Sequence, residues 1–139
     1  MNQEPITIQT TVNAPMDKVW ECWTSPDDIP SWAFASDDWE APASENDLQV
    51  GGKFKTVMAA KDKSASFDFG GTYTTVQEHA LIEYDIDDGR HVKTEFESTP
   101  EGVKITQTFD PENENPREMQ REGWQSILDN FKKYAESKS

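Results

Sequence analysis

The residues of this sequence that could perform acid–base chemistry are three pairs of neighbouring carboxylates. They are Asp27-Asp28, Asp37-Asp38 and Asp87-Asp88. Two carboxyl groups in one site can share a proton, so that one acts as an acid while the other acts as a base. All three pairs fall at an expected helix start or in an expected loop, where capping and hydration account for acidic residues. We therefore interpret them as surface groups and not as a catalytic pair.

The two histidines and the single cysteine do not form the pattern of a metal site or of an activated nucleophile. His91 shares one face of an expected strand with Lys93 and Glu95, which predicts that it faces solvent, and His79 lies in an expected turn. Cys22 lies between two tryptophans of an expected helix, which favours buried packing over reactivity. The sequence also lacks a Gly-x-Ser-x-Gly elbow, a P-loop and a dinucleotide fingerprint. We therefore predict no metal, no cofactor and no evident catalytic residue.

Large aromatic side chains on the inward faces of the expected strands are the most informative feature of the sequence. Each could belong to an ordinary core, but so many rings in a small domain favour space between a curved sheet and a helix. The predicted cavity-lining residues are Phe54, Met58, Phe69, Tyr73, Phe96, Gln107, Trp124, Ile127 and Phe131. The polar members of these faces are Tyr73, Gln107, Thr56 and Thr94. Such groups could orient a ligand, or could equally satisfy a neighbour or a buried water.

Six segments that could position these side chains show the alternation of apolar and polar residues typical of half-buried strands. They are residues 6–12, 54–58, 67–76, 82–86, 92–96 and 103–109. The short loops between consecutive segments favour an antiparallel meander. Residues 35–46 are acidic and lack this alternation, so we expect them to be irregular.

Three helix starts carry a proline at the first helical position, where its missing amide has no partner to lose. Two short helices are expected after the first strand, one beginning at Pro15 and one at Pro26 and running towards Trp32. A third begins at Asn115-Pro116 with a sequence similar to a capping box, and apolar residues of period near 3.6 continue it over 119–135. Because only this helix is long enough to cover the sheet, the elements predict an α+β fold with a curved antiparallel sheet around the C-terminal helix.

Length and charge restrict the classes of function. The 139 residues predict one domain spanning 1–139, and 11% aromatic residues offset a hydrophobic fraction of only 34%. The formal net charge is −14, and the longest basic run is Lys132-Lys133, so we expect neither nucleic acid nor an anionic membrane surface as a partner. The first residues lack the features of a signal peptide, and no apolar segment approaches the roughly 20 residues of a membrane span. We therefore expect a cytoplasmic protein, either a monomer or a homodimer.

Several short segments occur in the order found in one known superfamily. They are Ala14-Pro15 with Val19-Trp20, Trp32, Val50-Gly51-Gly52-Lys53-Phe54, Gly71-Thr72-Tyr73, and Gly123-Trp124 with Leu128. In this set the chain resembles the START-like, or SRPBCC, superfamily. Within it, the chain is similar to the stand-alone relatives of the C-terminal domain of the activator of the ninety-kilodalton heat-shock chaperone's ATPase. The resemblance implies the helix-grip fold of the birch-pollen allergen, with a cavity between sheet and helix that relatives use for apolar or amphipathic molecules.

Three functions follow from these observations. The leading hypothesis is a non-catalytic protein that binds a small apolar or amphipathic molecule between the sheet and the terminal helix. The resemblance also implies an interaction module for a chaperone or another protein, acting through its acidic surface, with residues 35–46 as the candidate surface. The third hypothesis is a cavity-based, cyclase-like enzyme with Tyr73 as the acid.

Overall fold

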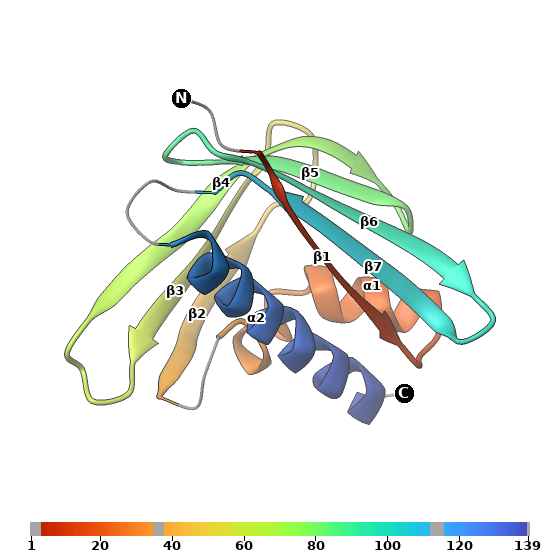
Figure 1. Ribbon diagram of the computed structural model, residues 1–139, viewed down its shortest axis with the longest axis horizontal. Helices are drawn as coiled ribbons and strands as arrows, with labels where there is room; N and C mark the ends of the chain where they lie inside the picture. Colours follow the sequence, from red (N-terminus) through yellow and green to blue (C-terminus); the bar gives the residue numbers. More distant parts are fainter. Residues whose placement is uncertain (1–3, 35–37, 112–115, 139) are drawn as a thin grey trace.

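A seven-stranded antiparallel sheet curves around one long helix (Figure 1). The computed structural model describes residues 4–34, 38–111 and 116–138. The strands are β1 Ile6–Val12, β2 Trp39–Asn46, β3 Lys53–Ala60, β4 Ser66–Gln77, β5 Leu81–Ile86, β6 His91–Thr99 and β7 Gly102–Phe109. The helices are α1 Met16–Thr24, the 3-10 turn η1 Ile29–Ser31, and α2 Arg117–Lys138.

The strand order is β1-β7-β6-β5-β4-β3-β2, so β2 to β7 form a meander and β1 joins it beside β7. Helix α2 crosses the concave face of this sheet, with Leu128, Phe131 and Ala135 buried beneath it. This arrangement confirms the predicted α+β helix-grip fold. Within the described residues, no helix is both long enough and apolar enough to cross a membrane.

Strand β2 corrects the expectation that residues 35–46 are irregular. Residues 39–46 pair with β3, with a register shift between Glu40 and Ala43 on either side of Pro42, while residues 35–37 lie outside the described part of the chain. A proline is tolerated there because β2 is an edge strand with a partner on one side only. The strand carries no alternating large apolar residues, because its buried position is occupied by the small Ala41. The usual strand signal is therefore missing.

Of the two short helices expected after β1, the first is α1 and the second is reduced to the single turn η1. The amide groups of Asp28 and Ile29 both donate to the carbonyl of Ser25, which starts a helical turn. Pro30 then supplies no amide hydrogen, so a regular helix does not continue. The expected cap of α2 at Asn115 lies outside the described residues.

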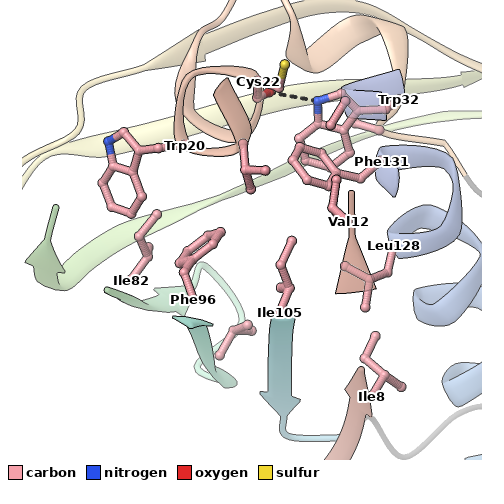
Figure 2. Close-up of a cluster of buried hydrophobic side chains, with 14 of the residues drawn as sticks. Ile8, Val12, Trp20, Cys22, Trp32, Ile82, Phe96, Ile105, Leu128 and Phe131 are labelled. Atoms are coloured by element: carbon pink, nitrogen blue, oxygen red, sulfur yellow. Dashed lines mark hydrogen bonds between the residues drawn. The ribbon is translucent and has the colours of Figure 1, made fainter. Parts of the chain in front are cut away.

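Helix α1 and η1 close one end of the concave face with a group of rings that we call the closed aromatic cluster (Figure 2). Its members are Trp20, Trp23, Trp32, Phe96 and Phe131. The indole Nε1 of Trp32 donates to the carbonyl of Cys22 over 2.9 Å, which joins η1 to α1. The Cys22 side chain is buried, and burial raises the pKa of its thiol, as suits a packing role.

Three polar side chains of α2 tie the helix to the outer edge of β1. Arg117 donates to the carbonyls of Glu4 and Pro5, just before β1. Gln125 Nε2 donates to the carbonyl of Gln9 (3.3 Å), and Lys132 Nζ donates to the carbonyl of Thr11 (2.8 Å). Gln9 and Thr11 lie two residues apart on β1, so their carbonyls are on the same side of the strand, and their bonds to α2 occupy positions that could otherwise pair with another strand. The bonds set the position of α2 across the sheet, and with it the space left beneath its first turns.

Candidate ligand-binding cavity

A cavity of about 420 Å³ lies between the concave face of the sheet and the N-terminal half of α2. Strands β3, β4 and β5 supply one wall, α2 supplies the opposite wall from Met119 to Leu128, and η1 with its flanking residues closes one end. The cavity exists because the closed aromatic cluster fills only one end of the concave face.

The sheet wall of the cavity is made of aromatic rings on neighbouring strands. The ring of Phe54 lies 4.7 Å from that of Tyr84 and 5.2 Å from that of Tyr73, measured between centroids. On the helix side, Trp124 stacks on Phe109 at 4.0 Å with an angle of 8° between the rings. Because Phe109 is fully buried, this stacking fixes the Trp124 ring against the sheet, below the N-terminal half of α2.

Two large apolar residues border the cavity while remaining half exposed to solvent. Phe67 is 50% exposed and Met119 is 59% exposed, and both belong to the cavity lining. The ring of Phe67 contacts that of Trp39 on β2 at 5.8 Å. These residues place the mouth of the cavity between the β3–β4 hairpin and the first turn of α2.

Seven of the nine side chains predicted to line a cavity do so in the structure. They are Phe54, Met58, Phe69, Tyr73, Gln107, Trp124 and Ile127. Phe96 and Phe131 face the same side of the sheet but lie in the closed aromatic cluster (Figure 2). Their ring centroids lie 5.6 Å and 4.8 Å from that of Trp23. A binding role for the other seven stays a prediction.

The polar side chains predicted on the inward faces pair with their neighbours. The hydroxyl of Tyr73 donates to Asn46 Oδ1 at 2.5 Å, and Gln107 Nε2 donates to Thr94 Oγ1 at 3.1 Å. The hydroxyl of Thr56 lies 3.2 Å from that of Ser44 on β2. Burial raises the pKa of Tyr73, so its proton remains on the ring oxygen and is directed at Asn46.

Three polar residues of the cavity wall were not singled out from the sequence: Tyr84, Arg90 and Gln120. Tyr84 is 8% exposed, and its hydroxyl has no hydrogen-bond partner among the described residues. Arg90 precedes β6 and continues the inward alternation of Val92 and Thr94, which is the signal that could have identified it. Its Nε donates to Asp88 Oδ2 over 2.8 Å.

The outer face of the sheet carries a different cluster around His91. Its Nδ1 lies 2.7 Å from Asp85 Oδ1 and its Nε2 lies 3.1 Å from Glu83 Oε1. The hydrogen bond to Asp85, followed by that to Glu83, raises the pKa of His91. Within residues 4–34, 38–111 and 116–138, no group of three His, Cys, Asp or Glu side chains, this cluster included, has the arrangement that could hold a metal ion. His91 does not line the cavity and lies on the outer face of the sheet, as the alternation of β6 predicts.

A curved sheet gripping a C-terminal helix over an internal cavity defines a START-like protein. Residues 13–136 match the family described as activator of Hsp90 ATPase homolog 1-like protein, and the chain belongs to this family. The family and the fold support a ligand-binding or interaction module in general.

Solved structures of similar chains agree with this assignment. The solution structure of an AHSA1-like protein from Aeromonas hydrophila is 44% identical, with a TM-score of 0.90 over 96% of this chain and 92% of that one. A protein from Cytophaga hutchinsonii is 51% identical, with a TM-score of 0.83 over 96% and 93% of the two chains. A protein from Chromobacterium violaceum shares the fold at 20% identity, with a TM-score of 0.86 over 96% and 99%. No curated protein matches the chain.

Proposed function

We propose that this protein binds a small apolar or amphipathic molecule in the cavity between the sheet and α2, without chemical conversion. The observation that carries the proposal is a space of about 420 Å³ lined mainly by aromatic and aliphatic side chains. Pockets for small molecules have this size and this character, with a few polar groups that set the orientation of the ligand.

The energetics of the cavity support an occupant. A dry void of about 420 Å³ would cost ~10 kcal/mol at ~24 cal/mol per Å³ of cavity volume. This is comparable to the whole stability of a domain, ~5–15 kcal/mol. Water reaches the space through the mouth at Phe67 and Met119, but rings on both walls offer it few hydrogen bonds. An apolar ligand that displaces this water gains the burial free energy of both surfaces.

A thermal-shift screen tests the proposal with fatty acids, sterols, flavonoids and aromatic polyketides. A ligand at about 100 times its dissociation constant adds ~2.7 kcal/mol to the stability, which raises the melting temperature by several degrees. Gly123→Leu places a side chain in the cavity and is expected to abolish that shift. Ser126→Leu adds the same side chain on the same helix at a position outside the cavity lining, and should retain it. A folded protein that responds to no class of compound contradicts the proposal, and so does an equal response from the two variants.

A second candidate function is an interaction module for a heat-shock chaperone, suggested by the description of the family. Its candidate surface is the β2 edge, where Glu40 and Glu45 are exposed. Capture of a purified ninety-kilodalton chaperone that is lost at high salt and in the Glu40→Lys, Glu45→Lys double variant would favour this function. Capture that survives both changes would refute an electrostatic interface on β2.

A cavity-based enzyme has weaker support, because the hydroxyl of Tyr73, its candidate acid, donates its hydrogen bond to Asn46 and not into the cavity. Tyr73→Phe provides the test, since an activity found in the cavity and unchanged in this variant would remove Tyr73 from its mechanism. The variant keeps the ring, and therefore the shape of the wall.

A further inference from the structure

The cavity has a charge opposite to that of the protein around it. The chain carries a formal net charge of −14. Among the cavity-lining residues in the described part of the chain, Arg90 is the only one that is charged at neutral pH, and no carboxylate is part of the lining. A cation held against an apolar cavity is costly unless an anion compensates it.

Arg90 is held in place by the hairpin between β5 and β6. Its carbonyl accepts the amide of Ile86 at 2.7 Å, and its side chain is only 20% exposed. Asp88, which is 53% exposed, engages Nε at 2.8 Å. The two terminal nitrogens of the guanidinium have no hydrogen-bond partner among the described residues, so they are available to an acceptor.

Tyr84 supplies a second donor on the same wall. It lies on β5, two residues before Ile86 and therefore on the same face of the strand. Tyr84 pairs with Val92 on β6, two residues after Arg90, and both side chains line the cavity. Burial raises the pKa of Tyr84, so its hydroxyl keeps its proton and acts as a donor. The Tyr84 hydroxyl has no protein partner among the described residues and borders the apolar cavity, so an acceptor on a ligand could take its hydrogen bond there.

We propose that the ligand is an amphipathic acid whose carboxylate accepts hydrogen bonds from Arg90 and Tyr84 while its apolar body lies along Phe54, Phe69 and Trp124. This inference rests on the proposed binding function and names the chemical class of the ligand. Guanidinium groups bind carboxylates through two parallel hydrogen bonds, which are stronger than bonds between neutral groups.

Matched acid and alcohol probes test the inference through the fluorescence of the cavity tryptophans. The pairs are octanoate with octanol, decanoate with decanol, and naphthaleneacetate with naphthaleneethanol, so both chain-like and ring-like bodies are compared. We expect an acid to bind about tenfold to a hundredfold more tightly than its alcohol. Arg90→Gln should remove this preference and leave the affinity for the alcohol within about twofold. Tyr84→Phe should weaken the binding of the acid while the ring wall is preserved.

Two control variants separate ligand binding from a structural role of Arg90. Arg121→Gln removes the same charge from an exposed position on α2 that does not line the cavity, and should change neither affinity. Asp88→Asn breaks the ion pair of the hairpin but keeps the cation, and should preserve or increase the affinity for the acid. An Asp88→Asn variant that loses the acid as Arg90→Gln does would assign Arg90 a bracing role and overturn the inference.

The remaining outcomes also decide the matter. If acids and alcohols bind equally well to the unmodified protein, binding stands and the acid preference is refuted, even if Arg90→Gln fails to fold. If neither member of any pair binds, the proposed function itself fails and the inference fails with it.

Discussion

Gly123 lies in the interior of α2, in its N-terminal half, and lines the cavity, at a position where most residues other than proline favour a helix more than glycine does. A Cβ atom built at this position meets no atom within 4 Å. Glycine in a helix interior is ~1 kcal/mol less favourable than alanine. Gly123→Ala should therefore stabilise the protein by about 1 kcal/mol, because it reduces the freedom of the unfolded chain without a clash. Gly123→Leu should add about 1 kcal/mol more by burying part of its side chain in the cavity.

These gains are large enough to measure by calorimetry. An unfolding entropy of ~2.1 cal/mol/K per residue gives ~290 cal/mol/K for 139 residues, so 1 kcal/mol corresponds to about 3 °C. Gly89→Ala is the matched control, since Gly89 has φ +97° in the β5–β6 turn and alanine is strained there. It should lower the melting temperature. If Gly123→Ala is neutral or destabilising, the space beneath α2 is smaller than the structure gives, and the cavity loses its support.

Three further predictions concern groups around the cavity and on the outer face. Tyr73→Phe should cost about 1 kcal/mol in urea unfolding, because Asn46 loses a buried donor. Trp124→Ala should cost about 3 kcal/mol by the same measurement, through loss of the stack on Phe109, and a smaller loss would show that the ring is not fixed there. The raised pKa of His91 means that its two ion pairs stabilise the fold fully below the unfolded pKa of 6.5, and that this contribution is lost as pH rises through the folded pKa. The stability difference between wild type and His91→Gln should therefore shrink at alkaline pH. It should be modest throughout, since the ring is 42% exposed. A difference that does not change with pH would contradict the assignment.

The fold could be predicted from the sequence because most strands bury one face against α2 and expose the other to water, which leaves a regular alternation of residue types. Six strands show period-2 alternation, since their concave face meets α2 and their convex face meets water. Strand β2 was not predicted because it lies at the edge of the sheet, contains Pro42 and buries little apolar surface. Its position depends on pairing with β3, which local sequence does not encode.

The cavity was predicted less completely, since alternation gives the face of a strand but not the place along it. Phe96 and Phe131 point to the concave side, yet α1 and η1 fill the space around them with Trp20, Trp23 and Trp32. Which end of the concave face remains open depends on where those helices dock. Gly123 was not predicted to line the cavity, because an empty space leaves no signal in a single sequence.

The bonds from α2 to the β1 edge have a consequence for the order in which the molecule assembles. The ribosome makes all seven strands before the helix that covers them, so the carbonyls of Gln9 and Thr11 and the aromatic concave face stay open until α2 docks. An unpaired strand edge beside exposed rings is a template for pairing with another chain. Lys132 and Gln125 therefore do more than position a helix: once α2 docks, their bonds occupy the β1 edge and close it to pairing with another chain.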